Sequence, residues 1–169
     1  MNLAANLTML FNEVPPLERF ARARAAGFRY AEFLFPLEHD VAEVAAALRA
    51  AELQLVLFNF AAGNRAAGDR GIASHPGRMA EFREDLARAV AAAGQLGNGL
   101  LHCMSGLRLP DISHEAQWRT LVANVRHAGE VCAAHGLPLL VEPLNDRDNP
   151  GYFLVGSAMG LRVVEEVAL

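Results

Sequence analysis

Apolar runs of strand length alternate five times with amphipathic runs of helix length, and this alternation is the strongest constraint on the fold of the chain. The predicted strands are residues 3–10, 30–35, 54–60, 99–104 and 138–145, and the predicted helices are residues 15–26, 40–51, 78–96, 114–134 and 157–169. Strands that alternate with helices form parallel sheets joined by crossover helices. We therefore expect an α/β fold.

Two architectures use this alternation, an open doubly wound sheet and a closed eight-stranded barrel. Five units in 169 residues fit the open sheet better by length, because a closed barrel takes about 250 residues. However, no glycine-rich phosphate loop follows the first strand, and polar residues recur at the strand ends. These two features favour a barrel-type sheet with about five β/α units, and they predict no nucleotide cofactor.

The composition indicates one soluble domain over residues 1–169, with 53% hydrophobic and 20% charged residues. A net charge of −4 argues against nucleic acid and anionic membranes as partners. No signal peptide or membrane-length apolar run is visible. Cys103 and Cys132 each lie within an apolar run, which is typical of reduced core thiols. We expect a cytoplasmic protein.

Glu142 is the strongest candidate for a catalytic residue. The segment 139–145 reads Leu-Leu-Val-Glu-Pro-Leu-Asn, which predicts a buried strand with a carboxylate at its C-terminal end. The C-terminal ends of the strands are where barrel enzymes place their chemistry. Residues 146–154 add polar groups, a Pro-Gly turn and two aromatic residues directly after this strand. The structural alternative for a single Glu is a salt bridge or a loop cap.

Polar residues also end the other predicted strands, and we expect them to line one site. They are Asn6, Thr8, Glu32, Asn59, His102, Ser105 and Asn145. Each has a structural alternative, since a strand-end Asn is often a turn residue and a His in an apolar strand is often a core histidine. Their common placement at one end of a sheet is what predicts a pocket. The loop of about sixteen residues at 61–76 is long enough to suggest a function.

The chain resembles the hydroxypyruvate isomerase family of the xylose isomerase-like barrels. The matching segments lie in the same order over nearly the whole chain, at residues 4–28, 31–36, 66–78, 81–83 and 139–154. Among them are AEFLFP at 31–36, AAGDRGIASHPGR at 66–78 and LLVEPLNDRDNPGYFL at 139–154. The resemblance implies that residues 1–169 are the N-terminal portion of a (β/α)8 TIM barrel. It also implies an aldose–ketose isomerase that acts on hydroxypyruvate or on another small sugar acid.

Moving a carbonyl to the neighbouring carbon requires a proton to leave one carbon and reach the next through an enediolate, and a carboxylate can perform both transfers. The resemblance implies this acid/base role for Glu142, together with ligation of a divalent metal, Mg²⁺ or Mn²⁺. It implies a substrate-binding role for Asn6, Glu32, Asn59, His102 and Asn145. Arg70 would bind the substrate carboxylate through its guanidinium, and its structural alternative is a solvated loop cation.

The chain departs from the family pattern in two places. Gly63-Asn64-Arg65 stands where the family has Gly-Asp-Trp, and the second Glu, the Asp and the His or Gln of later strands are absent. Three hypotheses follow. In the first, the chain is most of an isomerase whose remaining three units were lost to truncation, and this fragment is inactive or poorly folded. In the second, it pairs with another copy or another chain and acts as an assembly subunit or a noncatalytic binder of small acids. In the third, it is a relative with a different metal-dependent activity, such as phosphodiester cleavage. Scattered histidines and a negative charge argue against the third.

Overall fold

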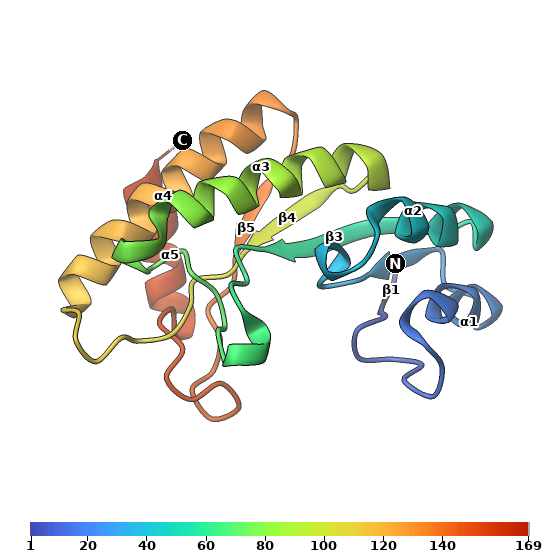
Figure 1. Cartoon of the computed structure of the whole chain (residues 1–169), viewed down its shortest axis with the longest axis horizontal. Coiled ribbons are helices and arrows are strands. Elements are labelled where there is room, and N and C mark those ends of the chain that lie inside the picture. Colours follow the sequence, from blue (N-terminus) through green and yellow to red (C-terminus); the bar gives the residue numbers. More distant parts are fainter. Residues whose placement is uncertain (169) are drawn as a thin grey trace. The chain divides into compact units, whose positions relative to one another are not determined.

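Five strands form a sheet in the order β1-β2-β3-β4-β5 in the computed structural model, which describes residues 1–168 (Figure 1). The strands are β1 (Ala4–Asn6), β2 (Tyr30–Glu32), β3 (Gln54–Phe60), β4 (Leu100–Cys103) and β5 (Leu139–Val141). The α-helices are α1 (Arg19–Ala25), α2 (Val41–Ala50), α3 (Met79–Leu96), α4 (His114–Ala134) and α5 (Gly156–Val167). Four 3₁₀ turns are η1 (Pro16–Glu18), η2 (Pro36–Glu38), η3 (Arg65–Ala67) and η4 (Pro76–Arg78). The predicted alternation of strands and helices is confirmed.

Most strands are shorter than predicted, and β1 and β5 show why. The carbonyl of Asn6 accepts hydrogen bonds from the backbone N–H groups of Met9 and Leu10, at 3.1 and 2.9 Å, so the chain turns away from the sheet after β1. β5 ends at Val141, two residues before Pro143, which has no N–H to donate to a neighbouring strand. The bounds of β3 and α4 match the prediction, whereas Leu169 at the predicted end of α5 lies outside the described residues.

The chain divides into two compact units, and the division falls within β3, α3 and β4. Unit 1 contains residues 1–59 and 88–101, and its strands β1, β2 and β3 pair in parallel. Figure 1 shows α1 and α2 beside these strands. Helix α2 begins after Asp40, whose Oδ1 accepts a hydrogen bond from the backbone N–H of Ala42 at 2.7 Å. Asp40 is therefore the N-cap of the helix predicted at 40–51.

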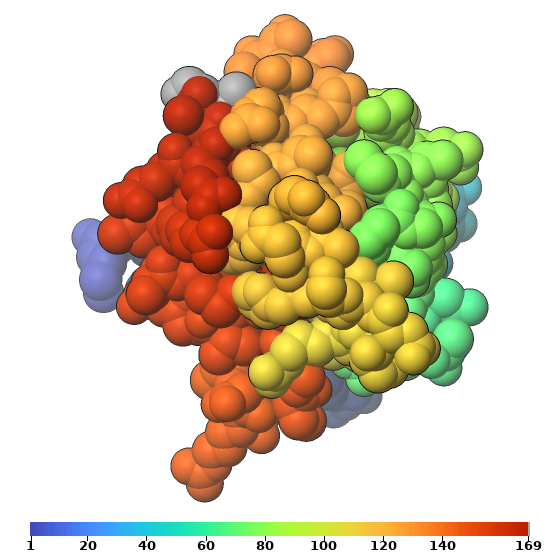
Figure 2. Space-filling view, turned by 90° about the vertical axis from the view of Figure 1, so that its left-hand side faces the viewer, coloured from blue at the N-terminus to red at the C-terminus, as the bar shows by residue number. Residues whose placement is uncertain are grey.

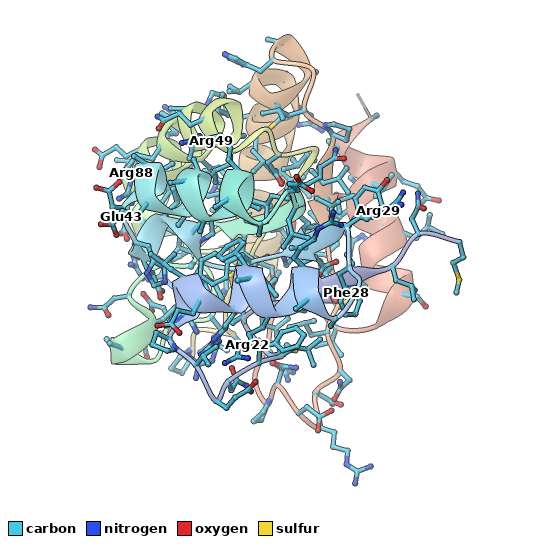
Figure 3. The ribbon with its side chains drawn as sticks, turned by 90° about the vertical axis from the view of Figure 1, so that its right-hand side faces the viewer. Arg22, Phe28, Arg29, Glu43, Arg49 and Arg88 are labelled. Atoms are coloured by element: carbon cyan, nitrogen blue, oxygen red, sulfur yellow. The ribbon has the colours of Figure 1, made fainter. Side chains whose placement is uncertain are left out.

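The core of unit 1 includes one apolar face from each of its first two helices. The buried residues are Phe20 and Ala23 on α1 and Val44, Ala45 and Leu48 on α2. The apolar spacing in the sequence predicts an inner face of Val41, Val44, Ala45 and Leu48 for α2, which is confirmed except at the half-buried Val41. For the first helix the spacing predicts Leu17, Phe20, Ala21 and Ala25, but of these only Phe20 is buried. The buried face of α1 is rotated from the predicted one because residues 16–18 form a 3₁₀ turn, which has three residues per turn instead of the 3.6 of an α-helix. Figure 3 shows polar side chains such as Arg22, Glu43 and Arg49 on α1 and α2.

Unit 2 contains residues 60–87 and those from 102 onward, and its helices α4 and α5 lie side by side (Figure 2). Trp118 of α4 is a buried core residue, and its Nε1 donates a hydrogen bond to Oε2 of Glu166 at 2.9 Å. Cys103 and Cys132 are both free and buried, as expected. No helix within residues 1–168 combines the length and hydropathy of a membrane span.

An apolar surface formed by β5 and α5 is exposed in unit 2. It contains Leu140 of β5 and Leu161 and Val164 of α5, which have 37%, 60% and 60% of their surface accessible. Beside them lies a groove of about 630 Å³ between α4, β5 and α5, whose lining includes Val125, Leu137, Val141 and Val163. β5 is also the last strand in the order of the sheet, and such an edge is a template for pairing with another chain.

We expect this surface to drive self-association of residues 1–169, because covering a leucine side chain stabilises an interface by about 1.5 to 3 kcal/mol. Replacing Leu140 with Lys should raise the dissociation constant of the resulting oligomer by about tenfold, as measured by sedimentation velocity over a concentration series. Ala123→Lys is the matched control, since Ala123 is an exposed residue of α4 that does not line the groove. A concentration-independent monomer would contradict the expectation.

Candidate functional site

The predicted site residues divide between the two units. Asn6, Glu32 and Asn59 belong to unit 1, and Arg70, His102, Glu142 and Asn145 belong to unit 2. In unit 1, Asn6 and Glu32 are paired in register at the ends of β1 and β2, and both are half-buried. The side-chain amide of Asn6 donates a hydrogen bond to Oε2 of Glu32 at 3.3 Å. The structure thus brings these two predicted residues together.

Thr8 and Asn59 complete the strand ends of unit 1. The hydroxyl of Thr8 accepts a hydrogen bond from the backbone N–H of Leu34 at 2.9 Å, which ties the turn after β1 to the residues after β2. The backbone N–H of Asn59 donates to the carbonyl of Leu34 at 2.9 Å, and Asn59 is buried. The turn after β1, the residues after β2 and the C-terminal end of β3 are therefore held together by hydrogen bonds.

His102 is a buried residue of β4, with only 6% of its surface exposed. Burial lowers the pKa of its imidazole to about 4, because desolvation disfavours the charged form. The ring is therefore neutral near pH 7. The core-histidine alternative thus fits the position of His102, whereas its predicted contact with a substrate stays a prediction.

Glu142 directly follows β5, at the end of the strand where the sequence places it, but the expectation of a buried strand there is wrong. Leu139 and Val141 are half-buried, Leu140 is exposed, and Glu142 is itself exposed. The reason is that, within residues 1–168, β5 has a neighbouring strand on one side only. The carboxylate is therefore accessible to solvent and to a small molecule.

Asn145 and Arg70 have local structural contacts. Oδ1 of Asn145 accepts a hydrogen bond from the backbone N–H of Asp148 at 2.8 Å, which stabilises the turn at 145–148. The guanidinium of the exposed Arg70 donates to the carbonyl of Asp69 at 2.8 Å. Both contacts match the structural alternatives named for these residue types, and the substrate-binding roles of Asn145 and Arg70 stay predictions.

Arg78 anchors the long loop after β3, a role that the sequence did not reveal. Its guanidinium donates to Oδ2 of Asp69 at 2.6 Å and to both carboxylate oxygens of Glu81 at 2.7 Å. Asp69 also accepts from the backbone N–H of Asn64 at 2.6 Å. The hydrogen bonds with Glu81 raise the pKa of Arg78 further above its already high value, and Arg78 lowers the pKa of Glu81.

Replacing Arg78 with Gln should loosen residues 61–77, because Asp69 loses its charged partner. The partly exposed ion pairs stabilise the closed loop by about 1 kcal/mol. We therefore expect limited proteolysis within the loop to become about fivefold faster. Arg83→Gln is the matched control, since Arg83 is an exposed residue of the same helix α3. Equal cleavage rates in Arg78→Gln and the wild type would show that these ion pairs do not hold the loop.

Buried polar residues join the strand-end loops of unit 2. The hydroxyl of Tyr152 accepts a hydrogen bond from the backbone N–H of Ser105 at 3.1 Å. The side-chain amide of Gln117 donates to Oγ of Ser74 at 3.2 Å and to the carbonyl of Leu107 at 3.0 Å. The segments after β3, β4 and β5 are thereby linked. The sequence indicated Ser105 and the aromatic residues after β5, but it gave no sign of Ser74 and Gln117.

The loops after β3 and β4 also approach each other closely at Gly71. A methyl group on its Cα would lie 2.5 Å from the carbonyl oxygen of Met104 and 2.6 Å from the backbone nitrogen of Gly106. Gly71 also has a φ of 121°, which strongly favours glycine. Only glycine therefore fits this position without moving the backbone.

Tyr152 is the described neighbour that connects this network to Glu142. Burial raises the pKa of its phenol, hydrogen bonds with Ser105 partly oppose the shift, and the negative charge of Glu142 adds to it. The phenol is therefore protonated near neutral pH. A neutral hydroxyl thus lies within electrostatic range of the candidate catalytic carboxylate.

The described residues do not by themselves fit a divalent metal. Over residues 1–168, no three side chains of His, Cys, Asp or Glu lie close enough together to hold an ion. The ligand role of Glu142 for Mg²⁺ or Mn²⁺ stays a prediction that needs further ligands.

Comparison with known proteins finds relatives that are named isomerases and a solved structure with a closely similar fold. It is 47% identical to the protein named 2-oxo-tetronate isomerase of Cupriavidus necator, over 97% of this chain and 63% of that protein. It is 40% identical to hydroxypyruvate isomerase of Escherichia coli, over 99% of this chain and 65% of that protein. A solved structure described as AP endonuclease, family 2, from Brucella melitensis is 43% identical, with a TM-score of 0.94 over 99% of this chain and 64% of that chain.

The chain therefore spans less than two thirds of the length of each of these relatives. The model of a protein family described as xylose isomerase-like TIM barrel matches residues 20–168. The parallel strands, the crossover helices and the polar strand ends agree with that family. This chain belongs to the xylose isomerase-like TIM barrel family.

Proposed function

We propose that the protein containing this chain isomerises a small hydroxy-oxo acid, with Glu142 as an acid/base catalyst. The observation that supports this role best is the position of Glu142, which directly follows a barrel strand and is accessible to a small molecule. The names of the curated relatives support the reaction class, since proteins 40% to 47% identical to this chain are named sugar-acid isomerases.

The proposed step on hydroxypyruvate conserves all atoms. A base removes one proton from C3, so that C2 and C3 become joined by the double bond of an enediolate. A proton then returns to C2, while the hydroxyl proton of O3 is lost and O2 gains one, so that the carbonyl moves from C2 to C3. The product is 2-hydroxy-3-oxopropanoate. Glu142 accepts or donates one of the two protons transferred at carbon, and in this proposal a second acid/base group performs the other transfer. Arg70 is the proposed partner of the substrate carboxylate.

Two substrates are candidates, and the relatives support both. Hydroxypyruvate has three carbons, and a 2-oxo-tetronate has four. The 47% identity to a protein named 2-oxo-tetronate isomerase supports the longer acid, whereas the 40% identity to hydroxypyruvate isomerase supports the shorter one. Measuring kcat/KM for both acids with the polypeptide in the length that the cell produces decides between them. Turnover of neither acid by a folded protein would contradict the proposal.

The same preparation distinguishes the remaining hypotheses. A noncatalytic subunit is supported by the exposed apolar surface at β5, and it would bind a second copy or another chain without converting either acid. A nuclease is supported only by the description of the solved relative as an AP endonuclease. Cleavage of DNA that contains an abasic site, with no conversion of either acid, would favour the nuclease.

A further inference from the structure

Two contacts hold the segment that carries Glu142 after it leaves β5. The backbone N–H of Leu144 donates to the carbonyl of Leu154 at 3.0 Å. The ring of Pro143 packs against Gly160, a buried residue in the interior of α5. A methyl group on the Cα of Gly160 would lie 2.9 Å from Cγ and 3.3 Å from Cδ of Pro143. Carbon atoms in van der Waals contact lie about 3.5 to 4.0 Å apart, so no side chain fits at 160 without moving this ring.

The position of the ring determines the backbone of Glu142. Proline has a fixed φ, and its Cδ restricts the preceding residue to extended conformations. A displacement of Pro143 therefore changes the point and the direction in which the Glu142 side chain leaves the strand. The ring is rigid, so it cannot give way as the end of a long side chain does.

A glycine inside a helix is otherwise unfavourable, because it is less stable there than alanine. Gly94 in the interior of α3 is the useful contrast, since no atom lies within 4 Å of where its methyl group would be. Alanine is compatible with the surroundings of Gly94 and is incompatible with those of Gly160. The close approach of α5 to Pro143 is thus a specific reason for glycine at position 160.

We infer that Gly160 is a positioning residue for Glu142: it allows Pro143 to lie directly against α5 and thereby fixes the carboxylate at the end of β5. The catalytic consequence of this inference rests on the proposed function. The positioning of Glu142 by Gly160 does not rest on the proposed function, because the position of Glu142 can be measured without turnover.

The test is a double-mutant cycle of Gly160→Ala and Pro143→Ala in the full polypeptide, with two measurements. One is kcat and KM for hydroxypyruvate and the 2-oxo-tetronate, and the other is the ¹³C resonance of the Glu142 carboxylate. Gly160→Ala should lower kcat at least tenfold with little change in KM, and it should shift the resonance. In the Pro143→Ala background the same substitution should change neither quantity, because Cγ and Cδ are gone. Gly94→Ala should behave as the wild type.

The outcomes separate the inference from the proposed function. If the wild type converts neither acid, the proposed function fails, and the resonance alone still decides whether Gly160 positions Glu142. A Gly160→Ala variant with the wild-type resonance, or one whose shift persists without the proline ring, would overturn the inference. If Gly160→Ala does not fold, Pro143→Ala carries the test, and it should broaden or shift the Glu142 resonance while α5 stays intact.

Discussion

Glu142→Gln is expected to lower kcat for the acid substrate by about 10²- to 10⁴-fold, the usual contribution of a positioned acid/base group. Glutamine has nearly the same size and shape as glutamate, but its amide neither accepts nor donates the transferred proton. KM should change much less, because Glu142 acts on the reacting carbon rather than on the substrate carboxylate. The measurement is steady-state kinetics on the full polypeptide.

The control for this substitution is Glu130→Gln, because Glu130 is an exposed residue of α4 in the same unit. Both variants should unfold at the wild-type temperature, since both side chains are exposed. If Glu142→Gln retains more than about half of the wild-type kcat, the carboxylate of Glu142 is not an acid/base catalyst, and the proposed role is wrong.

Stability is expected to fall as the pH decreases from 6.5 toward 4, because His102 is buried in its neutral form. The folded protein holds the pKa of His102 at about 4, while the unfolded chain has a value near 6.5. Between these two values the unfolded state binds more protons, so acid favours unfolding. The difference corresponds to about 3 kcal/mol of unfolding free energy, present above pH 6.5 and lost by pH 4.

Urea unfolding at a series of pH values measures this effect, and His102→Gln is the variant that isolates it. The variant cannot be protonated at position 102, so its unfolding free energy should lack this part of the pH dependence. Titration of the His102 ring by NMR should give a pKa near 4 in the folded protein. An identical pH dependence in the variant and the wild type would show that His102 is not responsible.

The sequence predicted the order of strands and helices because that order depends on local patterns. Apolar runs and helix-starting residues such as Asp40 act within a few residues, and the bounds of β3 and α4 were predicted correctly. The burial of β5 was predicted wrongly because it depends on which strands flank it, and neighbours in a sheet are not local in sequence. The prediction of the buried face of α1 was wrong for a more local reason, because residues 16–18 form a 3₁₀ turn before the helix.

The sequence likewise predicted only those parts of the candidate site that depend on local patterns. The polar strand ends at Asn6, Glu32 and Glu142 were visible in the sequence because each follows an apolar run. The contacts that hold the loops of unit 2 were not visible: the salt bridge between Arg78 and Asp69 spans nine residues, and the hydrogen bond between Gln117 and Ser74 spans 43. No pattern in one sequence connects such pairs. The resemblance identified the segment that contains Glu142, whereas only the structure shows that Gly160 packs against its neighbour Pro143.

The most direct test of the central claim is isomerisation of hydroxypyruvate or the 2-oxo-tetronate by the full polypeptide in D₂O, followed by NMR. An enediolate that is protonated by a carboxylate gives a product with deuterium on the carbon that receives the proton, because the carboxyl proton exchanges with solvent. We predict deuterium at C2 of the product in the wild type, and with Glu142→Gln we predict that product forms about 10²- to 10⁴-fold more slowly. A product that carries only the hydrogen of the substrate would contradict proton transfer through Glu142.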